Sequence, residues 1–242
     1  MNNNHKTPLS KKEKKITAVK LIRWSGMAAM VAGFIFAAIQ PIHPPDFLPS
    51  VTTTAWATIM PVKLVMCLLF LLGFTGLYAR QVEETGWIGL ISFLILSLSW
   101  TIQTAFIFIE TFLLPVLAVP APEFVESILG IFNGFPGDMN IGALPTVYGL
   151  TGILYMLGGL LFGIATFRAG ILPFWAAGLL AIASAVTPAA ALLPHEIQRF
   201  AGIPVGLAVA WLGYALFSER REKAFESSVD QGMVMPEPSK VA

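Results

Sequence analysis

Apolar residues in this chain fall into long, nearly uninterrupted blocks that are separated by short polar or proline-rich segments. A helix that crosses a bilayer needs about 20 consecutive apolar residues, and six of the blocks approach or exceed that length. The predicted spans are residues 22–41, 57–79, 87–113, 147–167, 171–193 and 200–218. The pattern therefore predicts an all-α fold, a polytopic membrane helix bundle with six transmembrane helices in residues 21–218.

Two polar tails flank the predicted bundle, and one of the connections between its spans is long. Residues 1–20 are basic and residues 219–242 are polar, so we expect both to be disordered tails. The longest connection, residues 114–145, has apolar residues at helical spacing after Pro122. That spacing predicts a short amphipathic helix, lying either on the membrane surface or over the bundle.

Composition agrees with a membrane protein. Hydrophobic residues make up 56% of the chain and charged residues only 12%, against a usual charged share of about 25%. The net charge of +1 comes without a basic stripe, so we expect the lipid bilayer and no nucleic acid as a partner. The single cysteine, Cys67, lies inside an apolar block, which excludes a disulfide framework.

The distribution of basic residues predicts the orientation. With six spans, all Lys and Arg residues except Lys63 and Arg199 lie in the two tails, at the start of the first span (Arg23) or in the turns near residues 83 and 169. These segments share one side of the membrane, and basic residues concentrate on the cytoplasmic side. Both termini are therefore predicted to be cytoplasmic, in a multi-pass protein of the cell membrane.

Three stretches resemble known sequences: GLYARQVEETGWIGLISFLI, IETFLLPVLA and LLFGIATFRAGILPFWAAGLL. They are similar to a group of uncharacterised bacterial multi-span membrane proteins, mainly over the second to fifth spans. The resemblance implies a multi-span topology and a bacterial inner-membrane location, and it brings no catalytic or ligand motif.

The span 87–113 carries two polar residues, Gln103 and Glu110, seven positions apart. Seven residues are about two helical turns, so both side chains project from one face, which must contact protein rather than lipid. Gln103 is the deeper of the two. We expect its amide to find a hydrogen-bond partner on a neighbouring helix, in a packing seam with a polar mouth.

Lys63, on the preceding span, is the predicted partner of Glu110. Folding the two spans about their short turn places Lys63 level with Thr104, about 9 Å from the level of Glu110. Side chains lean toward the N-terminus of their own helix, so Lys63 leans outward and Glu110 inward. A competing interpretation has Lys63 extending alone to the outer surface. With Tyr155, the candidate intramembrane polar cluster is Lys63, Gln103, Glu110 and Tyr155.

A second set of polar residues, His43, Asp46, His195 and Glu196, lies in the outer connections. Histidines and carboxylates together can bind zinc, but no spacing here matches a known ligand motif such as HExxH. We interpret them as solvated turn residues and predict neither a metal site nor a cofactor.

Small residues recur at three- and four-residue spacing in the first, fourth and sixth spans, and GxxxG occurs at Gly159–Gly163 and Gly202–Gly206. Such faces permit close helix packing, either within the chain or between copies in a homo-oligomer.

Three function classes remain, and the third, an intramembrane or outward-facing enzyme, is disfavoured because no nucleophile, Walker or dinucleotide motif occurs. The first is a non-enzymatic structural or regulatory membrane component. The alternative is a small transporter or permease with a polar outer vestibule around Lys63, Gln103 and Glu110. A sealed, dry bundle would favour the first class, and a deep outward cavity that reaches Gln103 would favour the second.

Overall fold

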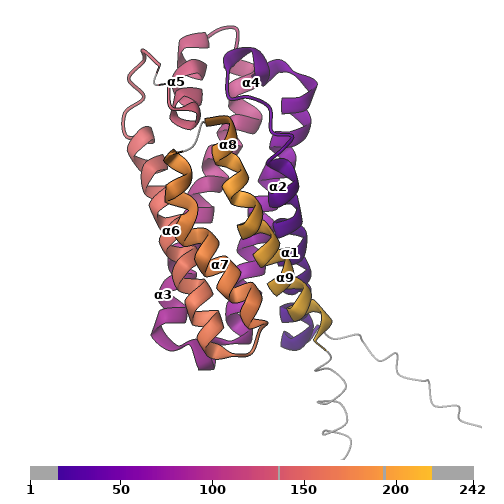
Figure 1. The fold of residues 1–242 in the computed structure, drawn as a ribbon. Coiled ribbons are helices and arrows are strands. Elements are labelled where there is room, and N and C mark those ends of the chain that lie inside the picture. The colour runs from indigo at the N-terminus through magenta and orange to yellow at the C-terminus, as the bar shows by residue number, and fades with distance from the viewer. Residues whose placement is uncertain (1–15, 136, 193–194, 220–242) are drawn as a thin grey trace, which may run out of the picture.

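The computed structural model describes residues 16–219 except 136, 193 and 194, and the predicted all-α fold is confirmed for these residues. The six longest packed helices are α1 Ala18–Ile39, α2 Thr54–Arg80, α3 Val82–Phe108, α6 Leu144–Ala169, α7 Phe174–Val186 and α9 Gly202–Ser218. Each helix packs on the next in this order and α9 closes onto α1, so they form a ring (Figure 1). The predicted tails lie almost wholly outside the described residues.

Shorter elements gather at the end of the ring opposite residues 16 and 219, which we call the distal end (Figure 1). They are the 3₁₀ helix η1 Leu48–Thr52, the π-helical turn η2 Ile109–Leu113, α4 Leu114–Leu117, α5 Pro122–Asn133, the 3₁₀ helix η3 Thr187–Leu192, α8 His195–Gln198 and the 3₁₀ helix η4 Arg199–Ala201. α5 buries Val125, Ile128 and Leu129 against η1 and the start of α2. Helix α5 thus covers part of the distal end.

Five helical stretches of the described chain are long and apolar enough to cross a membrane, one fewer than predicted. They are Ala18–Ile39, Thr54–Arg80, Val82–Leu117, Leu144–Ala169 and Arg199–Ser218. The predicted span 171–193 contains instead α7, of 13 residues, followed by η3. Pro188 accounts for the change, because proline has no N–H to donate to the α-helical ladder.

The turn between α2 and α3 is tighter than predicted. α2 ends at Arg80 and helical backbone resumes at Val82, but Gly86 has φ 56° and ψ −150°. This conformation favours glycine and separates the first turn from the straight part of α3. At its other end α3 continues through η2 and α4 to Leu117, beyond the predicted end at residue 113.

Small residues bring α1 and α9 into close contact. A Cβ atom at Gly206 would lie 2.6 Å from the carbonyl oxygen of Gly33, and one at Gly213 would lie 2.6 Å from that of Gly26. These two small-residue faces are therefore packed against each other within one chain. Association of copies through such faces stays a prediction.

Large apolar side chains fill the ring on the side of the described chain ends. Phe70, Phe74, Phe162, Leu96 and Leu180 belong to one buried cluster there. Phe74 and Phe162 meet edge to face with their ring centroids 5.4 Å apart. Beyond this cluster, toward the distal end, polar side chains also line the interior of the ring.

Candidate functional site

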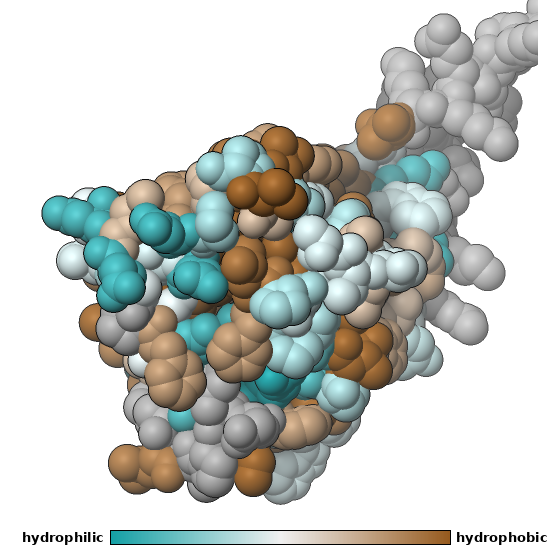
Figure 2. All heavy atoms as spheres, turned by 90° about the horizontal axis from the view of Figure 1, so that it is seen from above, coloured by the Kyte–Doolittle hydropathy of each residue, from teal (hydrophilic) through white to brown (hydrophobic). Residues whose placement is uncertain are grey.

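A cavity of about 720 Å³ occupies the distal end of the ring. We call it the distal cavity, and its walls come from α1, α2, α3 and α6 and from the loops and short helices above them. Seen from above, this end of the molecule carries hydrophilic residues around a hollow (Figure 2). The polar residues that line the distal cavity are Gln40, His43, Asp46, Lys63, Gln103, Glu110, Tyr148, Thr187, Gln198 and Arg199.

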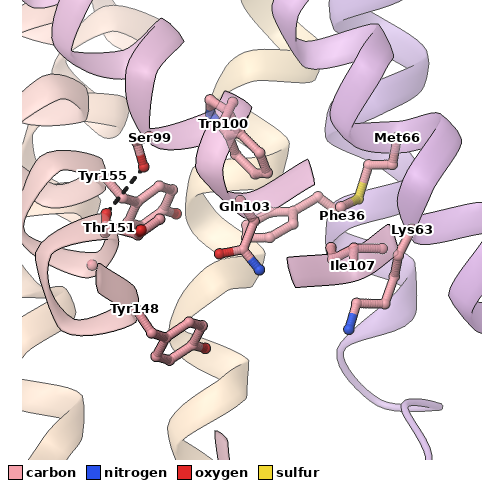
Figure 3. A pocket seen from close by; sticks show the side chains of 11 residues that line it. Phe36, Lys63, Met66, Ser99, Trp100, Gln103, Ile107, Tyr148, Thr151 and Tyr155 are labelled. Atoms are coloured by element: carbon pink, nitrogen blue, oxygen red, sulfur yellow. Dashed lines mark hydrogen bonds between the residues drawn. The ribbon is translucent and has the colours of Figure 1, made fainter. Parts of the chain in front are cut away.

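A smaller space of about 250 Å³, the inner chamber, continues the distal cavity toward the middle of the ring. Both spaces are lined by Phe36, Lys63, Met66, Gln103, Tyr148 and Gly152. The inner chamber adds Ser99, Trp100, Ile107, Thr151 and Tyr155 (Figure 3). The cavity therefore has a charged entrance and a mainly apolar, aromatic interior.

Lys63 and Glu110 form an ion pair at the entrance. Lys63 Nζ lies 2.7 Å from Glu110 Oε2, and the two side chains are 13% and 3% exposed. The same ammonium lies 2.9 Å from His43 Nε2, while His43 Nδ1 lies 2.7 Å from the carbonyl oxygen of Pro44. Since that carbonyl can only accept, Nδ1 carries the proton and Nε2 accepts from Lys63. We call His43, Lys63 and Glu110 the entrance triad.

The environment of His43 holds its imidazole neutral. Burial lowers the pKa of His43 from 6.5 to about 3, and the positive charges of Lys63 and Arg199 add to the shift. The loop that carries His43 is also held by Arg199, whose Nη1 donates to the backbone carbonyl of His43 at 2.9 Å. A neutral imidazole is the form that can accept a hydrogen bond from the Lys63 ammonium.

A π-helical turn places Glu110. The segment Ile109–Leu113 departs from the α-helical bonding pattern, and such single π turns occur often at functional sites. Trp56, which is fully buried, donates from Nε1 to the backbone carbonyl of Glu110 at 2.9 Å. The bond ties the π turn to the start of α2, which brings the Glu110 side chain within reach of Lys63.

Gln103 does not have the hydrogen-bonded packing seam that the sequence predicts. Its side chain extends into the space between α2 and α6 and makes no hydrogen bond with the other side chains that line the inner chamber (Figure 3). The indole N–H of Trp100 and the hydroxyl of Tyr155 are buried, and the described protein offers neither a partner. This face of α3 therefore lines a cavity, because Trp100, Gln103 and Ile107 all project into it.

The candidate cluster from the sequence is thus divided between two levels. Lys63 and Glu110 meet at the entrance, Gln103 lies below them, and Tyr155 belongs to the inner chamber. The structure adds Trp100, which a search of the Gln103 helix face at three-residue spacing would have found.

Two of the outer polar residues also line the cavity, namely His43 and Asp46. The side chains of His195 and Glu196 lie outside the described part of the chain. Among the side chains that are described, no three His, Cys, Asp or Glu residues are grouped as metal ligands would be. The sequence offered no signal for the contact of His43 with Lys63, since it depends on how a proline-rich loop folds back.

Comparisons of the chain with protein-family models, with curated proteins and with solved structures give no match.

Proposed function

We propose that this chain is a six-span protein of the bacterial inner membrane, with both termini cytoplasmic, that binds a small molecule entering from the outer side. The cavity reaches Gln103, the outcome expected of a transporter, but the buried cluster that contains Phe74 and Phe162 fills the ring beyond it. We therefore assign a non-enzymatic role, in which binding regulates the protein or a partner. The observation that carries the proposal is a cavity of about 720 Å³ that extends from the distal end to the Gln103 side chain. Specific small-molecule sites occupy cavities of about 300–1,000 Å³ with few polar groups.

Side-chain exposure supports the membrane location. Large apolar side chains are exposed along the helices, for example Leu72 and Ile182. Trp24, Trp87 and Trp175 are exposed near the ends of helices on the side of the chain termini. Tryptophan is enriched at membrane–water interfaces, so these residues suit the cytoplasmic surface.

The length of α7 together with η3 supports a sixth span. The 13 residues of α7 and the 6 of η3 are continuous. At about 1.5 Å and 2.0 Å rise per residue they cover roughly 31 Å, against about 30 Å for the hydrocarbon core. The sixth crossing is therefore completed by a 3₁₀ segment.

The entrance triad supports binding rather than chemistry. The Lys63 ammonium is engaged by both Glu110 and His43, and the His43 imidazole donates to Pro44. Each side chain of the entrance triad is therefore held in position by its contact with the next one. A second candidate, a small permease, is favoured by the position of the cavity within the ring of helices, since permeation needs a central path.

A pair of glycine substitutions on α6 tests the proposal. A side chain at Gly152 would project into the distal cavity and inner chamber, whereas Gly149 is one turn away and lines neither; both positions have open space for a Cβ atom. We expect Gly152→Leu to abolish saturable binding of small apolar probes to the full chain in nanodiscs, and Gly149→Leu to leave it unchanged. Saturable binding that survives in Gly152→Leu would contradict a site in this cavity.

A further inference from the structure

We propose that the ligand of the distal cavity is a monocarboxylate with an apolar body, whose carboxylate pairs with the Arg199 guanidinium and whose body extends toward the inner chamber. This assignment rests on the proposed function and specifies the class of molecule that the cavity binds.

Two cationic side chains from distant parts of the chain meet at His43, on the wall of the distal cavity. Lys63 Nζ lies 2.9 Å from the imidazole Nε2, and Arg199 Nη1 donates to the backbone carbonyl of the same residue at 2.9 Å. Both cationic side chains line the cavity. Their positive charges add to the effect of burial in lowering the pKa of His43 to about 3, so both charges act at this wall.

These contacts leave hydrogen-bond donors on both cationic side chains. A lysine ammonium has three N–H donors and an arginine guanidinium has five. Lys63 uses one donor for Glu110 and one for His43, and Arg199 uses one for the His43 carbonyl. The remaining donors of the guanidinium can bind a carboxylate through two parallel hydrogen bonds, a geometry for which arginine is suited.

Arg199 is also a charged group that lines the cavity without a counterion. Glu110 is paired with Lys63 at 2.7 Å, and Asp46, the other carboxylate in the lining, takes part in an interaction of its own. Within the part of the chain that the structure describes, Arg199 makes no ion pair, and its hydrogen bond goes to a neutral carbonyl group. A partly buried charge without a counterion is costly, so a ligand that brings one negative charge is stabilised here.

The inner chamber suits the apolar body of such a ligand. It is continuous with the distal cavity, because Lys63, Gln103 and Gly152 line both spaces. Within it, Phe36 and Trp100 meet edge to face with their ring centroids 5.8 Å apart (Figure 3). An apolar chain or aromatic ring gains free energy when it leaves water for such walls. A molecule with a carboxylate at one end and an apolar group at the other therefore matches the two parts of the cavity.

Three probes that differ only at one end test the assignment: 6-phenylhexanoate, 6-phenylhexanamide and 6-phenylhexylamine, each radiolabelled. Saturable binding to the full chain in nanodiscs is measured at neutral pH against empty nanodiscs. We expect the carboxylate to bind at least about tenfold more tightly than the amide or the amine, which is the effect of hydrogen bonds to a charged group.

Variants of Arg199 separate its charge from its structural role. Arg199→Gln should weaken binding of the carboxylate about tenfold and leave that of the amide unchanged. Arg199→Lys, which keeps the charge but not the paired donors, should give an intermediate affinity. Arg168→Gln, which removes an exposed charge at the other end of the bundle, should leave every affinity unchanged. If Arg199→Gln weakened the carboxylate and the amide equally, Arg199 would only hold the loop that carries His43, and the assignment would be wrong.

Binding of the amide or the amine as tight as that of the carboxylate would also overturn the assignment. If Gly152→Leu abolished that binding, the cavity would still be the site, and the proposed function would stand without the carboxylate. If no probe binds saturably, the proposed function itself fails.

Discussion

The Lys63 ammonium lies 2.9 Å from Nε2 of His43, so a cationic side chain and a histidine share one hydrogen bond at the entrance to the cavity. The contact exists only while the imidazole is neutral, because a protonated ring has no lone pair and would repel Lys63. The state of His43 is therefore coupled to the Lys63–Glu110 pair.

That coupling predicts a pH dependence of stability. The pKa of His43 is lowered from 6.5 to about 3, so the unfolded chain binds this proton before the folded chain does as the pH falls. The stabilising effect is complete above pH 6.5 and is lost between 6.5 and 3, by up to about 1.4 kcal/mol per pH unit. Unfolding of the purified chain between pH 7.5 and 5 should show this decline.

His43→Gln is the matched control, because glutamine also offers an acceptor oxygen but does not titrate. The variant should show a flatter stability profile between pH 7.5 and 5 than the native chain. Equal slopes in the two proteins would assign the pH dependence to other groups.

Removing one member of the Lys63–Glu110 pair should cost more than removing both. Lys63→Met leaves a 3%-exposed carboxylate without its counterion, which costs about 3–5 kcal/mol in comparable buried pairs. The double variant Lys63→Met with Glu110→Gln should recover at least half of that loss. Arg168→Gln, which removes an exposed charge at the other end of the bundle, should change the free energy of unfolding by less than about 0.5 kcal/mol. Additive losses in the double-variant cycle would show that the pair is not coupled.

How much of the site the sequence predicts depends on how far apart its parts lie in the chain. Helix geometry and a short turn are enough to bring Lys63 and Glu110 together, since both belong to consecutive helices. The cavity around Gln103 is different, because it depends on how far α1 and α6 stand from α3. Side-chain volumes across several helices decide that distance, and no periodicity in one helix records it.

The same distinction applies to the fold. Long apolar blocks are sufficient to predict the all-α class and the five helical stretches that are long and apolar enough to cross a membrane. The shortness of α7 follows from one residue, Pro188, whose effect on an apolar block is either a kink or an end. The loop that carries His43 to Lys63 contains several prolines, and their turns follow no repeating pattern.

The close approach of α1 and α9 should depend on glycine at Gly206. An added methyl group there would lie 2.6 Å from the carbonyl oxygen of Gly33, so Gly206→Ala should destabilise the protein by about 1–3 kcal/mol. Gly149→Ala places the same methyl group in open space on α6 and serves as the control, with little or no loss expected. Equal thermal stability of the two variants would mean that α1 and α9 can move apart without any loss of stability.

The proposed sixth span predicts that the two ends of the α7–η3 segment lie on opposite sides of the membrane. The native chain suits cysteine labelling because Cys67, its single cysteine, is fully buried. Leu192, at the end of η3, is 88% exposed, and Phe174, at the start of α7, is 47% exposed. We expect an impermeant maleimide added to intact cells to label Leu192→Cys, and to label Phe174→Cys only after the membrane is opened. Labelling of both variants from one side would instead make α7 a segment that enters and leaves by the same face, and would reduce the bundle to five crossings with its termini on opposite sides.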